Sequence, residues 1–159
     1  RISYTKIFKS MSSIIFRSQV LWAQIDANMH MRHSAYADLG AQARLMAMEK
    51  IGFTSDAMRH YKIGPILFRE ELIYRREIRP NEIISVTSPL SNCRRDGSRW
   101  SIKHEILKED GEVAAIIHAD GAWIDQIKRK LTALPSELME KMALMEMTED
   151  FHWDEVPVS

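Results

Sequence analysis

The sequence has only one cysteine, Cys93, among 159 residues. A lone cysteine cannot form an internal disulfide, and no run of Cys and His shows the spacing of a zinc site. Stabilisation by internal disulfides or by a structural metal is therefore not expected. Cysteine usage of this kind favours a reducing compartment, which predicts a cytoplasmic location.

Long apolar runs and an excess of charge of one sign are also missing. No stretch of 18 apolar residues exists, and Arg17 interrupts the short run at residues 14–16 before it reaches the length of a signal-peptide core. Lys and Arg number 22, as do Asp and Glu, so no net field favours a nucleic acid or an anionic membrane. We expect neither as a partner, and any anion site must be a local cluster.

Glycine and proline are scarce, at 6 and 5 residues, while hydrophobic residues make up 45% and charged residues 28%. This is ordinary globular composition, and the length suits one domain with a sizeable core. We therefore predict a single domain over residues 1–145. Residues 146–159 form an acidic tail without periodicity, which we expect to be loosely held.

Residues 34–51 carry the one strong helix signal. Ser34 is a possible N-cap, proline is absent, and a glycine follows the segment. The polar positions Asp38, Gln42 and Glu49 fall on one narrow stripe at helical spacing. Because most of the remaining surface is apolar, we expect the rest of the domain to wrap this helix of about five turns.

Strand patterns surround the helix, with turn residues between most of them. The predicted strands are 14–22, 66–78, 82–92, 98–108 and 112–126, and a terminal helix is predicted within 131–145. Along 98–108 one face carries Trp100, Ile102, His104 and Ile106, so this face is expected to be covered and the other wet. One long helix against one antiparallel sheet is an α+β layer architecture.

Two motifs carry a resemblance to a known family. The stretch WAQIDANMHM at residues 22–31, running into Ser34, Ala35 and Tyr36 and then Ala43 and Arg44, resembles the hydroxybenzoyl-CoA thioesterase family and its acyl-CoA thioesterase relatives. The stretch LIYRREI at residues 72–78, followed by EIISV at 82–86, resembles the second and third strands of that family. The resemblance covers residues 14–140 and implies the hotdog fold, in which a curled antiparallel sheet wraps a long central helix.

The same resemblance implies an acyl-CoA thioesterase with Asp26 as its catalytic carboxylate. Thioester hydrolysis needs a carboxylate, acting as nucleophile or general base, beside a donor for the oxyanion. In the family the residue seven places beyond the aspartate supplies a backbone N–H for this purpose, which corresponds to His33. Asn28 and His30 follow Asp26 in the same loop, where each is a candidate for positioning water or the thioester. The alternative for Asp26 is a turn or helix cap.

Other nucleophiles find no support in the sequence. No Ser-His-Asp spacing and no nucleophile-elbow glycines are present, and Cys93 lies at the end of a predicted strand, beside a hairpin turn, rather than at a helix start. Serine or cysteine chemistry is therefore not expected.

Substrate contacts are less defined by the sequence. The cluster Arg94, Arg95 and Arg99 is a candidate for binding CoA phosphates, as is the basic run at residues 128–130, although solvated turn charge explains both equally well. Met46 and Met48 with Leu45 are candidates for an acyl tunnel, with core packing the commoner explanation. No separate cofactor is expected, since CoA is part of the substrate.

Hotdog relatives build their sites at subunit contacts, so we expect a homodimer with sheets joined edge to edge, or a tetramer of two such dimers. Two other functions remain open at this point. One is a hotdog enoyl-CoA hydratase or dehydratase, whose paired histidine and acidic motif is not visible here. The other is an acyl-CoA or acyl-carrier binding module that has lost hydrolysis.

Overall fold

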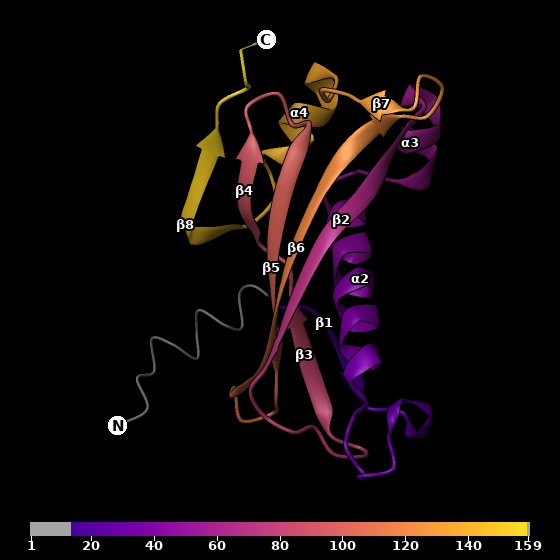
Figure 1. Cartoon of the computed structure of the whole chain (residues 1–159), viewed down its shortest axis with the longest axis vertical. Coiled ribbons are helices and arrows are strands. Elements are labelled where there is room, and N and C mark those ends of the chain that lie inside the picture. The colour runs from indigo at the N-terminus through magenta and orange to yellow at the C-terminus, as the bar shows by residue number, and fades with distance from the viewer. Residues whose placement is uncertain (1–13, 159) are drawn as a thin grey trace. The chain divides into compact units, whose positions relative to one another are not determined.

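The computed structural model describes residues 14–158. The elements in chain order are β1 (Ile14–Gln19), the 3-10 helix η1 (Trp22–Gln24), α2 (His33–Lys50), α3 (Ser55–Tyr61), β2 (Ile63–Tyr74), β3 (Ile83–Thr87), β4 (Leu90–Arg94), β5 (Arg99–Leu107), β6 (Val113–Asp125), β7 (Lys130–Leu131), α4 (Ser136–Met142) and β8 (Met147–Asp154). One long helix and a largely antiparallel sheet thus account for most of the chain, as the sequence predicts (Figure 1).

The strands form one sheet with the order β1-β3-β5-β4-β8, while β6 pairs with β5 and also with β2 and β7. The pairs β1/β3, β3/β5, β4/β5 and β6/β7 are antiparallel, and β4/β8 is parallel. β3 faces the end of β5, where Val86 opposes Ile106, whereas β4 faces its beginning, where Cys93 opposes Trp100. The long strand β5 therefore has two different neighbours on the path of the sheet.

The prediction of a single strand over residues 82–92 is wrong. The structure divides it into β3 and β4, with Ser88 and Pro89 between them. A proline has no N–H to donate to a ladder, and it favours an extended or turn conformation for the residue before it. The carbonyl of Pro89 instead accepts a hydrogen bond from the Lys103 amide, at 3.1 Å.

The described residues form two compact units, and the first comprises 14–46, 71–88 and 104–117. In this unit the early turns of α2 pack against the strands through side chains at helical spacing, namely Ala35, Tyr36, Leu39 and Ala43. The facing strand residues are fully buried, and they are Ile84, Val86, Ile106, Ala114, Ala115 and Ile117. This contact aligns the beginning of α2 against β3, β5 and β6.

The second unit comprises 47–70, 89–103 and 118–158. Phe53 and Trp123 stack at its centre, with ring centroids 5.1 Å apart. Gly121 lies against the Trp100 ring, and a Cβ at this position would lie 2.2 Å from that ring. The absence of a side chain at residue 121 is therefore a packing requirement of β6.

Two further expectations need correction, and one helix was not predicted. α2 begins and ends within one residue of the prediction, but it is not wrapped on all sides, since Leu45 is 41% exposed. The terminal helix spans only Ser136–Met142, because residues 130–131 pair with β6 as β7 and Pro135 precedes the first turn.

The short helix α3 was not predicted. It is capped at its start by the Thr54 hydroxyl, which accepts from the Ala57 amide at 3.1 Å.

The expectation of a loosely held C-terminal tail is also wrong. Residues Met147–Asp154 form β8, which lies along β4 in parallel register, with Trp153 opposite Cys93 (Figure 1). Phe151 and Trp153 add an edge-to-face ring pair at 5.1 Å. Strand pairing of this kind depends on a distant partner, so the acidic composition of the segment did not reveal it.

Candidate active site

A tight loop connects η1 to α2 and contains Asp26. The Asp26 amide donates to the His30 carbonyl at 2.9 Å, and the Met29 amide donates to the Asp26 carbonyl at 3.1 Å. An isolated bridge joins Ile25 and Met31 at the base of the loop. Met29 reaches the left-handed region with φ of 62°, which closes the turn. The loop is therefore a defined hairpin-like structure at the helix entrance.

The carboxylate of Asp26 is half-buried and accepts hydrogen bonds from the backbone of its own loop. Its Oδ1 accepts the Asn28 amide at 2.9 Å and the His30 amide at 3.2 Å. Such side-chain-to-backbone bonds are the ordinary role of an aspartate in a turn. Both bonds use Oδ1, and neither uses Oδ2. The side chain is thus held in one orientation by one of its two oxygens.

Arg32 attaches η1 to the start of α2. Its amide donates to the Gln24 carbonyl at 2.7 Å, and its guanidinium donates to the Ala23 carbonyl and, at 3.0 Å, to the Ser34 hydroxyl. The first amides of a helix have no intrahelical acceptor, and they lie at the positive end of the helix dipole. In α2 these are the amides of His33 and Ser34, whose residues are exposed.

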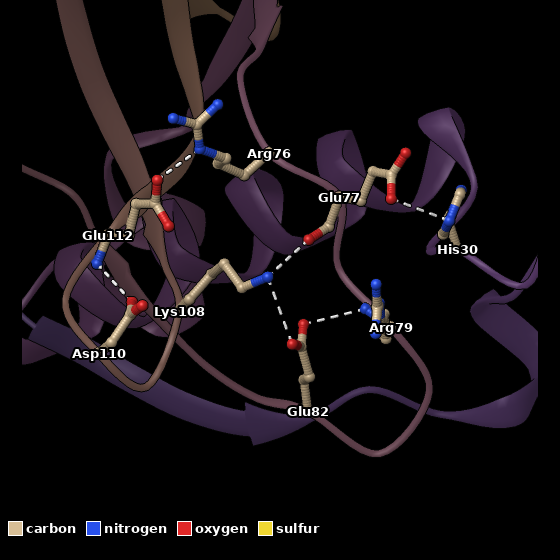
Figure 2. A network of polar contacts seen from close by, with 8 residues as sticks. All are labelled: His30, Arg76, Glu77, Arg79, Glu82, Lys108, Asp110 and Glu112. Carbon is tan, nitrogen blue, oxygen red and sulfur yellow. Dashed lines mark hydrogen bonds and ion pairs between the residues drawn. The ribbon is translucent and has the colours of Figure 1, made fainter.

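A polar network lies beside this loop (Figure 2). His30 Nε2 lies 3.0 Å from the Glu77 carboxylate, which connects the Asp26 loop to the segment after β2. Lys108 donates to the Glu77 carbonyl at 2.8 Å and lies 3.3 Å from the Glu82 carboxylate. His30 thus has a defined partner 47 positions along the chain, whereas Asn28 contributes its backbone amide to the loop.

Two tyrosines lie at the start of α2. Tyr74 Oη, at the end of β2, donates to the His33 carbonyl at 3.3 Å, and its ring packs edge to face on Tyr36 at 5.0 Å. Burial raises the pKa of Tyr36 to about 12, with further contributions from Tyr74 and from nearby carboxylates, Asp26 among them. Tyr36 is therefore a neutral phenol at physiological pH. Sequence reasoning placed both tyrosines in family-like motifs but assigned them no role.

The buried face of β5 holds His104, which the alternation in the sequence placed on the covered side. Its Nδ1 bonds the Thr87 carbonyl at 2.8 Å, and its Nε2 bonds Arg44 Nη1 at 3.0 Å. Because arginine only donates, Nε2 must accept and Nδ1 must carry the proton. Burial lowers the pKa of His104 to about 3. The positive charge of Arg44 also lowers this pKa, whereas the bond to the Thr87 carbonyl raises it. His104 is a neutral packing residue of this unit.

The predicted phosphate-binding cluster is largely occupied within the chain. Arg95 pairs with the Glu155 carboxylate at 2.5 Å, and Arg99 lies over the Phe68 ring at 5.3 Å. The basic run at 128–130 lies in the turn after β6 and at the start of β7. Asp125 caps this turn by accepting the Ile127 and Lys128 amides, each at 2.9 Å. The residues of this run are exposed, as are Arg95 and Arg99.

Cys93 is fully buried in β4. Burial raises the pKa of its thiol to about 12, with smaller contributions from Asp96 and Asp154. A thiol in this state is not a nucleophile at neutral pH. Among residues 14–158 no group of three or more His, Cys, Asp or Glu has the geometry of a metal site. No helix in the described part of the chain is long and apolar enough to cross a membrane.

The family model of the thioesterase-like superfamily matches residues 20–142, which include the Asp26 loop, α2 and strands β2 to β6. The chain belongs to the thioesterase-like superfamily. The expected recognition and the expected enzyme class, a thioester hydrolase, are confirmed at the level of this family. Among curated proteins, none matches the sequence.

Solved structures with the hotdog fold resemble this thioesterase-like protein along most of its length. A hypothetical protein from Staphylococcus aureus in complex with CoA has a TM-score of 0.75 and 20% identity, with 80% of each chain covered. The DHNA-CoA thioesterase of the same organism has a TM-score of 0.73 and 23% identity, covering 80% of this chain and 87% of its own. A 1,4-dihydroxy-2-naphthoyl-CoA thioesterase from Synechocystis has a TM-score of 0.72 and 13% identity, covering 81% and 94%. The predicted hotdog fold is thereby confirmed.

Proposed function

We propose that this protein hydrolyses the thioester of an acyl-CoA to the free acid and CoA, with Asp26 as the catalytic carboxylate. The observation that supports it most directly is the position of this carboxylate. Two amides bond Oδ1, so the side chain is oriented at the entrance to α2, within seven residues of the amides that begin the helix. A carboxylate that acts as base or nucleophile, together with helix-start amides that stabilise an oxyanion, can hydrolyse a thioester.

Two routes fit this arrangement. As a general base, Asp26 takes a proton from water, whose oxygen adds to the thioester carbonyl. The His33 amide stabilises the resulting oxyanion, and its collapse breaks the C–S bond and releases the CoA thiolate. As a nucleophile, Asp26 attacks the carbonyl itself and displaces the thiolate, and water then hydrolyses the mixed anhydride. In both routes Asn28 and His30 act by holding the carboxylate and its loop.

The substrate class rests on the family and on the names of similar structures. Two of them are thioesterases for an aromatic acyl-CoA, and one contains CoA, although each is under 25% identical to this chain. We propose that the substrate of this protein is also a CoA ester, and we do not carry over the aromatic acyl group. Its phosphates are proposed to meet Arg94, Arg95 and Arg99 or the run at 128–130. The second candidate is preferred, because Arg95 and Arg99 already have intrachain partners.

The test is release of free thiol from a panel of acyl-CoAs that differ in chain length and aromaticity. Asp26→Asn keeps the size and the hydrogen-bond acceptor but removes the charge and basicity. Loss of general-base assistance costs roughly 10²–10⁴-fold in kcat, with little change in substrate binding. Asp38→Asn, an exposed carboxylate on α2, is the matched control and should retain activity.

Three outcomes separate this function from its alternatives. Addition of water to an enoyl-CoA identifies a hydratase, and saturable binding without turnover identifies a binding module. Normal turnover by a folded Asp26→Asn protein returns Asp26 to the role of a turn residue.

We also propose that the protein is a homodimer whose sheets join edge to edge, or a tetramer of such dimers. The support is the long edge strand β2, which among the described strands pairs with β6 alone. Light scattering at micromolar concentration measures the mass directly, and a fully active monomer contradicts the proposal.

A further inference from the structure

The segment between β2 and β3 holds the loop of the candidate active site at two adjacent positions. Residues 75–82 belong to neither strand, so their backbone groups need partners from elsewhere in the fold. The Ile78 carbonyl accepts the Met31 amide at 2.7 Å, and Ile78 itself is fully buried. One residue earlier, the Glu77 carboxylate lies 3.0 Å from His30 Nε2. The position of this segment therefore determines where the end of the loop lies.

The contact with Glu77 bears on Asp26 because His30 is bonded through both its ring and its backbone. The His30 amide donates to Asp26 Oδ1 at 3.2 Å, while the ring meets the Glu77 carboxylate. An ionised carboxylate only accepts, so this bond requires a proton on Nε2. Glu77 thus fixes the ring of the residue whose amide orients the carboxylate proposed to be catalytic.

Lys108, which directly follows β5, holds the same segment (Figure 2). Its Nζ donates to the Glu77 carbonyl at 2.8 Å and lies 3.3 Å from Glu82 Oε1. The other carboxylate oxygen of Glu82 accepts the Arg79 amide at 2.9 Å. The side chains of Lys108 and Glu82 are only 21% and 30% exposed, so water competes little for this contact. One ammonium group therefore joins residues on both sides of the turn at 80–81.

We propose that Lys108 is a positioning residue for thioester hydrolysis, which acts on Asp26 through Glu77 and His30. This inference rests on the proposed function and assigns roles to two side chains outside the Asp26 loop. Lys108 fixes the backbone of Glu77, and the Glu77 carboxylate fixes the His30 ring. The His30 amide then keeps Asp26 Oδ1 in its orientation.

Small displacements matter here because the orientation of Asp26 depends on few bonds. Its Oδ1 accepts the amides of Asn28 and His30, and no further bond of the carboxylate is seen in the described part of the chain. A misplacement of about 1 Å can cost on the order of 100-fold in rate, because the reacting group leaves its productive geometry. Lys108 acts at a distance through two other residues, so we expect a smaller effect of about 10-fold.

A neighbouring ion pair provides a matched control (Figure 2). Arg76 directly precedes Glu77 and pairs with Glu112, and both side chains are exposed. Glu112 follows the same turn between β5 and β6 that begins with Lys108. Its side chain bonds Arg76, and in the described structure it bonds neither Glu77 nor His30. Glu112→Gln should therefore leave hydrolysis unchanged.

Steady-state kinetics of the full chain, with an acyl-CoA that it hydrolyses, tests the role of Lys108. Lys108→Met keeps the apolar stem and removes the ammonium group. We expect kcat to fall about 10-fold with KM unchanged, because positioning acts on the chemical step and not on binding. Lys108→Arg keeps the charge and the donors and should retain most of kcat. An unchanged kcat in Lys108→Met, or a loss confined to KM, overturns the proposal.

A double-mutant cycle tests whether Lys108 acts through Glu77. Glu77→Met removes the carboxylate and should lower kcat by a similar factor of about 10. In this background Lys108→Met should lower kcat further by less than about 2-fold, since the link that it supports is already lost. Effects that multiply to about 100-fold would show that the two residues act independently, which contradicts the proposed route.

Hydrogen exchange measures the orientation of Asp26 without any substrate. The amides of Asn28 and His30 are protected by Asp26 Oδ1, so Lys108→Met should speed their exchange several-fold. The Ala43 amide, inside α2, reports general unfolding and should keep its rate. Equal acceleration at all three amides would mean that the substitution only destabilises the fold, and it overturns the positioning role.

The results separate this inference from the proposed hydrolysis. Faster exchange at Asn28 and His30 in a protein that hydrolyses no acyl-CoA supports the link from Lys108 to Asp26 and contradicts the proposed function. Hydrolysis that Lys108→Met leaves at the wild-type rate contradicts the positioning role, and the thioesterase proposal then stands without it.

Discussion

The hydroxyl of Tyr74 donates to the carbonyl of His33 at 3.3 Å, which joins the end of the edge strand β2 to the first residue of α2. The same ring packs edge to face on the buried ring of Tyr36. One side chain thus connects a proposed dimer edge to the helix whose first amides are proposed to hold the oxyanion.

Removal of this hydroxyl tests the connection. In Tyr74→Phe the ring contact with Tyr36 remains, and a hydrogen bond worth about 0.5–1.5 kcal/mol is lost. We expect kcat to fall several-fold while KM changes little, because the helix entrance is less firmly positioned. Tyr61→Phe, which removes a hydroxyl from α3, serves as control. Equal activity of Tyr74→Phe and wild type in steady-state assays would contradict a positioning role.

His104 makes stability depend on pH. Its folded pKa of about 3 lies below the ordinary value of 6.5, so between these values the unfolded chain binds a proton that the folded chain does not. The contribution of His104 to the unfolding free energy is therefore fully present above pH 6.5. It decreases as the pH falls toward 3. Urea titrations from pH 7 to 4 should show this loss. His104→Gln should flatten the slope, whereas His118→Gln, on the next strand, should retain it.

Gly121→Ala should be severely destabilising. Its Cβ would lie 2.2 Å from the Trp100 ring and 2.6 Å from the backbone oxygen of Ile66, and the backbone oxygen cannot rotate away. Overpacking in a core costs about 1–3 kcal/mol, and a backbone clash places this variant at the upper end. Gly64→Ala is the matched control, because the nearest atom there is the end of the flexible Gln126 side chain, at 2.9 Å. Thermal melts that show equal losses for both would refute the argument.

The two basic candidates for CoA phosphates are separable by salt and mutation. Neutralising residues 128–130 should raise KM at low ionic strength, and the difference should shrink as salt screens the charges. Neutralising Arg94, Arg95 and Arg99 together should change KM less, because Arg95 and Arg99 are engaged within the chain. An unchanged KM in both variants would show that CoA is not held through these groups.

Local patterns in the sequence determined several elements closely. The apolar surface and end signals of α2 placed it within one residue, and alternation placed β5 and β6 within one residue at each end. The motif at residues 22–31 led to the family that the model match confirms. These features depend on spacings of two to four residues, which the order of amino acids displays directly.

The tertiary structure alone decided the rest. The bond between His104 and Arg44 joins residues 60 positions apart, and that between Tyr74 and His33 joins residues 41 apart. The division of residues 82–92 into β3 and β4, and the pairing of β8 with β4, likewise depend on partners distant in the chain. No local period records such partners, because cross-strand pairing and burial are set by which surfaces meet on folding. Sequence therefore located Asp26, while only the fold determined what surrounds it.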